Sequence, residues 1–410
     1  MDNCFLPAEI LLPRTEEMER WSVIACDQFT SDPAYWERVR AFVGSAFSTL
    51  HMILPEAELA RMGEQIYAQA SAYMRNSLQK GKFDIYPDSF VYVERTQLNG
   101  SIRCGVVGMI DLTAYEFDPA KDAPICATEE TVLNRIPPRV VLRQQACLEF
   151  PHAIMLCNDF DCRLIESVTK VKDQLPKLYE FDLMENGGHI AGWLLSGADA
   201  EAFKERLDAY VQTQNETYAG KTHALFAVGD GNHSLVTAKC CYENAIKDHP
   251  ETDNELNPAR YALVELENIH TPALAFEPIH RVLTEIDVEK FLADLSAISV
   301  DAGCPIVWVA GEKRGAIHLH VKEGDLAVTV LQEFLDKWLE SNRGEIDYIH
   351  DEDSLINLAK NVDSVGLLLP AIDKKGLFEY CSAGRVFPRK TFSMGHGREK
   401  RYYLEGRKIQ

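Results

Sequence analysis

The residues best suited to chemistry lie in one short segment, 229–234, which has the sequence Gly-Asp-Gly-Asn-His-Ser. Glycines let the backbone approach a ligand closely and expose consecutive N–H groups, which suits phosphate and other oxyanions. Asp230 adds a carboxylate that can hold Mg²⁺ or accept the proton of an attacking hydroxyl. His233 can donate a hydrogen bond to a transferring phosphoryl oxygen. The segment therefore predicts phosphoryl transfer, with these phosphate contacts: Gly229, Gly231, Asn232 and Ser234.

The elements on either side of this segment position it. The apolar run 224–228 predicts a strand that leads into it, and the spacing of apolar residues over 235–245 predicts a helix after it, with Ser234 as a possible N-cap. A helix N-terminus carries partial positive charge and attracts anions. The alternative is a tight strand-to-helix turn, in which Asp230 and Asn232 satisfy only local backbone groups.

A second cluster combines a carboxylate with two guanidinium groups. Glu129 is followed by Arg135 and Arg139, which flank the stiff pair Pro137-Pro138. These groups could bind a polar substrate, since arginine offers a planar fork to oxyanions. The alternative is a surface ion-pair network among these side chains.

The C-terminal tail is strongly basic. Residues 385–410 contain eight basic and two acidic side chains, so the tail carries +6 while the whole chain carries −21 and the remaining residues −27. Either the tail docks onto the acidic body, or part of it closes over an anionic ligand.

Composition excludes several classes of protein. The chain has 410 residues, of which 46% are hydrophobic and 26% charged, which is ordinary for a globular protein. Its acidic surface disfavours nucleic-acid and membrane-surface binding, and no apolar run approaches the roughly 20 residues of a membrane helix. We therefore expect a soluble protein, and a cytoplasmic one because no secretory signal is visible at the N-terminus. The eleven cysteines form no CxxC pair, so we expect them to be reduced. HExxH, P-loop and GxGxxG motifs do not occur.

Mixed helix and strand patterns predict an α/β fold with a mixed sheet. Alternating runs on both sides of Asn99-Gly100 predict a β-hairpin. We expect a main α/β lobe over 1–284, an additional α/β subdomain over 285–369, and a basic tail over 370–410 that returns to the main lobe.

Four separated motifs resemble the domain-of-unknown-function 1015 (DUF1015) family of bacterial proteins. They lie, in the family's order, at 127–139, 228–234, 276–281 and 388–405. The family's most recognisable motif usually has the sequence Asp-Gly-His-His-Arg, which is similar to the ligand-binding motif of the ParB and sulfiredoxin superfamily, including free-serine kinases. Asp230, Gly231 and His233 match this motif. Asn232 and Ser234 depart from it, and the arginine missing at 234 removes a guanidinium group that would bind phosphate there.

The resemblance implies a ParB/sulfiredoxin-like core and a small-molecule phosphotransferase. The implied substrate is free L-serine or phosphoserine, with pyrophosphate or a nucleotide as donor and Mg²⁺ as cofactor. Asp230 or Glu129 would accept the hydroxyl proton. Asp27 would hold either the metal or the substrate amine, and Asp230 is a second candidate metal ligand. The developing charge would be neutralised by three residues of the tail: Arg389, Lys390 and Arg401.

Two other functions remain open at this point. One is a ParB-like module that binds a nucleotide or phosphate without turning it over, and the other is a phosphoserine phosphatase. The sequence leaves open the oligomeric state, the direction of the reaction and the donor.

Overall fold

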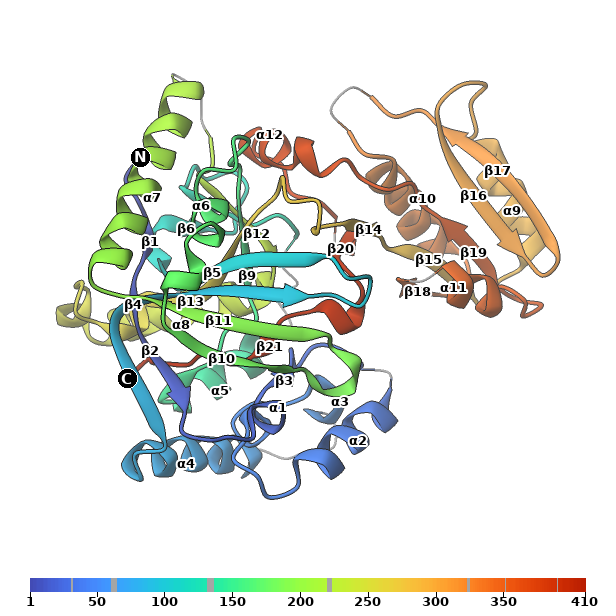
Figure 1. The fold of residues 1–410 in the computed structure, drawn as a ribbon. Coiled ribbons are helices and arrows are strands. Elements are labelled where there is room, and N and C mark those ends of the chain that lie inside the picture. Colours follow the sequence, from blue (N-terminus) through green and yellow to red (C-terminus); the bar gives the residue numbers. More distant parts are fainter. Residues whose placement is uncertain are drawn as a thin grey trace. The chain divides into compact units, whose positions relative to one another are not determined.

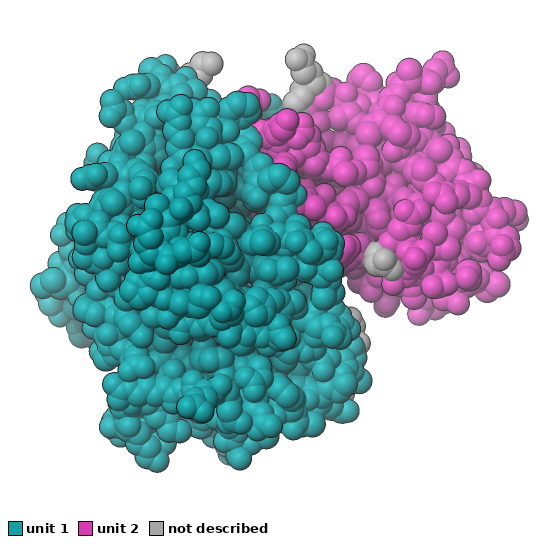
Figure 2. All heavy atoms as spheres, viewed as in Figure 1, with its two compact units in different colours: residues 1–274, 381–385, 397–410 teal, residues 275–380, 386–396 magenta. Residues whose placement is uncertain are grey.

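The computed structural model describes residues 1–30, 32–59, 65–130, 136–219, 223–322, 325–350, 352–388 and 390–410. The chain forms two compact units (Figure 2). Unit 1 contains residues 1–274, 381–385 and 397–410, and unit 2 contains residues 275–380 and 386–396. The predicted mixed α/β fold is confirmed (Figure 1). None of the described helices is long and apolar enough to span a membrane.

Among the described residues of unit 1, eleven strands form one mixed sheet, with the main order β10-β11-β4-β5-β13-β9-β12-β7-β6, while β1 pairs with β5 and β2 with β4. The strands of this unit are β1 (Phe5–Leu6), β2 (Ala8–Pro13), β3 (Val23–Ile24), β4 (Phe83–Thr96), β5 (Ile102–Asp111), β6 (Tyr115–Glu116), β7 (Ile125–Cys126), β8 (Leu148–Glu149), β9 (Ile154–Cys157), β10 (Lys177–Asp182), β11 (His189–Leu195), β12 (Phe226–Asp230), β13 (Tyr261–Asn268), β21 (Tyr402–Tyr403) and β22 (Arg407–Lys408). Its helices are α1 (Met18–Trp21), α2 (Pro33–Val43), α3 (Glu56–Leu59), α4 (Gln65–Gln79), α5 (Ile136–Gln145), α6 (Ile165–Thr169), α7 (Ala198–Thr217) and α8 (Asn232–Asp248).

Both faces of this sheet are buried, as strand β4 illustrates. Successive residues of a strand point to opposite faces, and those of β4 enter two different apolar clusters. Phe90 and Tyr92 of β4 join one apolar cluster with residues of α7 and α8. Val91 and Val93 join a second cluster with residues of α2 and of the C-terminal segment. The predicted hairpin is confirmed, since β4 and β5 pair antiparallel on either side of Asn99-Gly100. The central strands are therefore rigidly held on both sides.

Unit 2 has its own core and its own sheet, with the order β17-β16-β19-β15-β18 among the described residues. Its strands are β14 (Phe276–Pro278), β15 (His280–Thr284), β16 (Cys304–Ala310), β17 (Lys313–Leu319), β18 (Glu345–Ile349), β19 (Val365–Leu368) and β20 (Phe392–Met394). Its helices are α9 (Val288–Ala297), α10 (Ala327–Ser341) and α11 (Glu352–Leu358), and α12 (Leu377–Ser382) follows along the chain.

The unit boundaries differ from the expected 1–284, 285–369 and 370–410. Residues 275–284 belong to unit 2, because β14 pairs with β20 and β15 pairs with β18 and β19. The tail is divided between the units: residues 370–380 and 386–396 lie in unit 2, and residues 381–385 and 397–410 lie in unit 1. Pairing between strands distant in sequence decides these boundaries, and composition does not reveal it.

Candidate functional site

The segment 229–234 forms a tight connection between β12 and α8. Gly231 is the N-cap of α8 and has a φ of 80°, in the left-handed region that favours glycine. A Cβ at this position would lie 2.8 Å from Cα of Ala153. The N-cap is therefore Gly231 and not Ser234, which lies within the first turn of α8. Gly229 is the penultimate residue of β12.

Asp230 forms an ion pair with a lysine of the C-terminal tail. Nζ of Lys400 lies 2.8 Å from Oδ2 of Asp230, and the backbone N–H of Gly231 donates to Oδ1 at 2.9 Å. Burial alone would raise the pKa of Asp230, but the charge and hydrogen bond of Lys400, with smaller contributions from His152 and the Gly231 N–H, lower it overall. Asp230 is therefore an ionised carboxylate beside a cation at the N-terminus of a helix.

The side chain of Asn232 is buried and hydrogen-bonded within the protein. Its Oδ1 accepts from the Thr128 N–H at 3.3 Å, and its Nδ2 donates to Oγ1 of Thr128 at 3.4 Å. Thr128 in turn donates to the Val228 carbonyl at 2.6 Å. These contacts bring Glu129, the next residue in the chain, to the vicinity of the turn. Asn232 thus has the local role that the alternative interpretation of this segment predicts.

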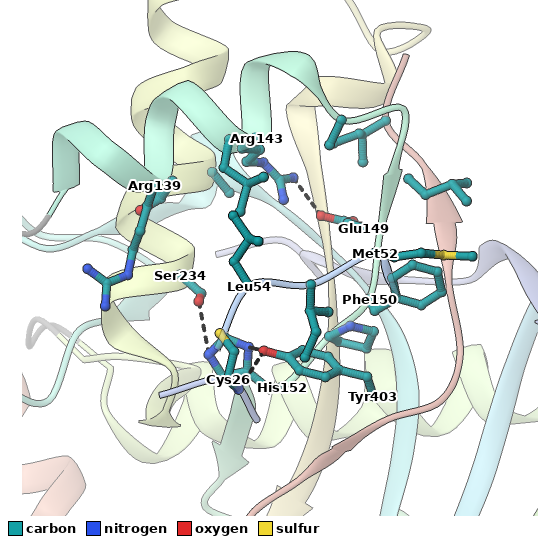
Figure 3. A pocket seen from close by; sticks show the side chains of 18 of the residues that line it. Cys26, Met52, Leu54, Arg139, Arg143, Glu149, Phe150, His152, Ser234 and Tyr403 are labelled. Atoms are coloured by element: carbon teal, nitrogen blue, oxygen red, sulfur yellow. Dashed lines mark hydrogen bonds and ion pairs between the residues drawn. The ribbon is translucent and has the colours of Figure 1, made fainter. Parts of the chain in front are cut away.

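The half-buried His233 and Ser234 lie in the first turn of α8. The His233 carbonyl accepts from Oγ1 of Thr237 at 2.7 Å. Oγ of Ser234 lies 3.0 Å from Nε2 of His152, and Nδ1 of His152 lies 3.2 Å from the hydroxyl of Tyr403 (Figure 3). Neither His152 nor Tyr403 is among the site residues predicted from the sequence.

Tyr403 connects this chain of hydrogen bonds to the N-terminal part of unit 1. Its hydroxyl accepts from the Cys26 N–H at 3.0 Å, and burial raises its pKa well above the usual value. Asp27 follows Cys26, and its Oδ1 accepts from Nε2 of Gln28 at 3.1 Å. The structure therefore brings the segment of Asp27 to the same region as His152 and Ser234.

A pocket of about 180 Å³ adjoins Ser234 and His152. Its wall is mainly apolar, and its charged lining residues are paired: Arg139 with Glu56, and Arg143 with Glu149 at 2.5 Å. In the view of Figure 3, His152 and Tyr403 lie at one side of the pocket and the Arg143–Glu149 pair at another. Arg139, a predicted phosphate contact, thus lines the pocket with a carboxylate partner already in place.

Arg401, a further predicted basic contact, is bonded to groups other than those of the turn. Arg401 is buried and donates to Glu265 at 2.6 Å, to Glu405 at 2.7 Å and to the Pro151 carbonyl at 2.8 Å. These bonds engage all three guanidinium nitrogens, so the expectation that Arg401 binds phosphate is corrected to a structural role. Lys390 lies in unit 2, whereas Arg135 and Arg389 lie outside the described residues.

Lys400 of the tail reaches Asp230. It was not among the site residues predicted from the sequence, although it lies in the motif at 388–405 and contributes to the charge of the tail. No motif distinguishes it from its basic neighbours, because the contact joins residues 170 positions apart.

The described residues contain no group of three or more His, Cys, Asp or Glu side chains arranged to hold a metal ion. Both carboxylate oxygens of Asp230 already have partners, Lys400 and the Gly231 N–H. A Mg²⁺ ion at Asp230 would therefore share the carboxylate with Lys400 and the Gly231 N–H.

Comparisons with known proteins give one family. The model described as "Protein of unknown function (DUF1015)" matches residues 6–365. No curated protein matches the chain.

Solved structures resemble it only distantly. A free serine kinase in complex with AMP is 11% identical with a TM-score of 0.39, over 73% of this chain and 91% of the kinase chain. A conserved hypothetical protein from Pyrococcus furiosus is 13% identical with a TM-score of 0.34, over 72% and 90%. SbnI from Staphylococcus aureus, with a C-terminal truncation, is 11% identical with a TM-score of 0.29, over 61% and 82%.

Proposed function

The chain belongs to the DUF1015 family, and on this basis we propose that it is a cytoplasmic phosphotransferase acting on a small hydroxyl compound, with free L-serine as the first candidate. The observation that carries the proposal is the ion pair of Asp230 with Lys400 at the N-terminus of α8. It brings a base, Asp230, and a cation, Lys400, from distant parts of the chain to the positive end of a helix, and these are groups that assist phosphoryl transfer.

Asp230 accepts the proton of the substrate hydroxyl, because the carboxylate is held ionised. The ammonium group of Lys400 and the N-terminus of α8 stabilise the negative charge on the transferring phosphoryl group. His233 donates a hydrogen bond to a phosphoryl oxygen. Asp27 orients the substrate amine, and Glu129 is the alternative base. The donor is pyrophosphate or a nucleotide, and any Mg²⁺ enters bound to the donor's phosphates, as is usual for this ion.

The decisive experiment supplies purified protein with L-serine, Mg²⁺ and, in turn, ATP, ADP or pyrophosphate, and measures phosphoserine by mass spectrometry. We expect phosphoserine with at least one donor and its loss in Asp230→Asn. Asp84→Asn is the matched control, since Asp84 forms an exposed ion pair with Arg14.

Two outcomes would contradict the proposal. Binding of a nucleotide without turnover by the folded wild type would indicate a sensor. Release of phosphate from phosphoserine, with no forward reaction, would indicate a phosphatase.

A further inference from the structure

The pocket of unit 1 has a serine and a histidine at its polar end, in an arrangement that phosphoryl transfer does not require. Oγ of Ser234 is 3.0 Å from Nε2 of His152, within hydrogen-bond distance (Figure 3). Both side chains are only partly buried, and both line the pocket. A ligand in the pocket can therefore reach the Ser234 hydroxyl, and His152 is placed to remove its proton.

A third residue orients the imidazole. Nδ1 of His152 lies 3.2 Å from the hydroxyl of Tyr403, which is fixed on β21 by the Cys26 N–H. When Nδ1 donates its proton to that hydroxyl, Nε2 is the acceptor that faces Ser234. A nucleophile, a base and a group that orients the base are the parts of a serine hydrolase triad, which is recognised by its geometry and not by its sequence order.

Cys26 also lines the pocket, but it is a poor nucleophile. Burial raises the pKa of its thiol to about 11. With this pKa, Cys26 remains protonated at neutral pH. The reactive form of cysteine is the thiolate, so the protonated thiol reacts slowly. Ser234 is thus the better-placed nucleophile of the two.

The pocket wall indicates the kind of substrate. Its apolar lining residues include Met52, Leu54, Leu148, Phe150 and Leu263. Its volume of about 180 Å³ slightly exceeds that of an engineered apolar cavity of roughly 150 Å³ that binds benzene. The pocket therefore suits an apolar group somewhat larger than benzene, such as a medium-length acyl chain.

We propose that unit 1 hydrolyses carboxylic esters of apolar acids, with Ser234 as nucleophile, His152 as general base and Tyr403 as a positioning residue. Oγ of Ser234 bonds to the ester carbonyl carbon while its proton passes to Nε2 of His152. The bond to the leaving alcohol breaks, and that alcohol takes the proton from Nε2. Water, deprotonated by Nε2, then attacks the acyl-serine and releases the acid, and Ser234 regains its proton. The positive end of α8 stabilises the oxyanion.

The first test uses a fluorophosphonate probe and p-nitrophenyl hexanoate, with no phosphate donor present, so that its result is independent of phosphotransferase activity. We expect one covalent adduct on Ser234 and faster hydrolysis of the hexanoate than of the acetate. Ser234→Ala abolishes both adduct and hydrolysis, and His152→Gln lowers kcat by roughly 10²–10⁴-fold. Ser101→Ala, a change in the turn between β4 and β5, is the control and keeps both.

Two further variants separate catalysis from folding, with circular dichroism as the check on the fold. Leu54→Trp fills the pocket and slows hydrolysis of the hexanoate more than that of the acetate. Tyr403→Phe shifts the pH profile of kcat, because the imidazole loses its hydroxyl partner. A folded wild type without probe adduct or ester hydrolysis would overturn the proposal, as would an adduct that persists in folded Ser234→Ala.

Discussion

Asp230 is ionised although it is mostly buried, because the charge of Lys400 offsets the hydration that the carboxylate loses on folding. Burial raises the pKa of a carboxyl group, whereas a cation at hydrogen-bond distance lowers it, and for Asp230 the second effect wins. A carboxylate whose pKa is lower in the folded than in the unfolded state stabilises the fold at pH values above its unfolded-state pKa. This contribution is lost as the pH falls through the folded pKa.

Lys400→Met should reverse the balance at Asp230, since burial then acts without its opposing charge. We expect the pKa of Asp230 to rise, and the acidic limb of the pH profile of kcat/KM to move to higher pH. The profile and an NMR titration of the Asp230 carboxyl group measure the shift, with Lys408→Met as the control for a tail lysine outside the site. An unchanged carboxyl titration would contradict the role assigned to Lys400.

The connection from β12 to α8 places Asp230, His233 and Ser234 at the start of a helix. It depends on Gly231, whose backbone is left-handed and where a Cβ would point at Ala153, the neighbour of His152 in the chain. The left-handed conformation disfavours other residues by about 1–2 kcal/mol, and the approach to Ala153 excludes a side chain in addition.

Gly231→Ala should destabilise unit 1 more than Gly100→Ala does. Both glycines have a φ near 80°, but a Cβ at position 100 would meet no atom within 4 Å. We expect Gly100→Ala to lower the free energy of unfolding by about 1–2 kcal/mol. Gly231→Ala should lower it by the same amount and by about 1–3 kcal/mol more from overpacking. Urea unfolding measures both, and equal losses would show that the contact with Ala153 has no energetic weight.

At the scale of the whole molecule, the end of the chain is built into unit 1. β21 pairs with β3, β22 pairs with β8, and Gly406 exchanges backbone hydrogen bonds with Leu11. Arg401 forms buried ion pairs with Glu265 and Glu405, and Arg407 donates to Glu149 at 2.8 Å. Within unit 1, the basic tail thus docks onto acidic side chains of the body, and one of its cations, Lys400, reaches the candidate site.

Arg401→Met should unfold unit 1 much more readily, because it leaves two carboxylates buried without their cation. Breaking a buried ion pair in this way costs about 3–5 kcal/mol. Lys408→Met removes a partly exposed pair with Glu9 and should cost about 0–1 kcal/mol. The difference in free energy of unfolding, measured in urea, checks the structural role of Arg401, and a loss of affinity for substrate without a loss of stability would contradict it.

The sequence by itself predicted the mixed α/β class, the hairpin at Asn99-Gly100 and the strand-to-helix connection at 229–234, because periodicity and turn chemistry are local properties of the chain. It also identified the motifs of the family. It placed Ser234 at the wrong helix position, since an N-cap depends on backbone dihedrals that several polar residues in a row leave open.

Only the tertiary structure decided which side chains meet. Asp230 and Lys400 are 170 positions apart, and Ser234 and His152 are 82 apart. Local patterns contain no information on such pairs, because strand pairing and core packing bring them together. The net charge of the tail left open whether it docks onto acidic side chains or closes over an anionic ligand. Within unit 1, the fold alone placed Arg401 in the core and Lys400 beside Asp230.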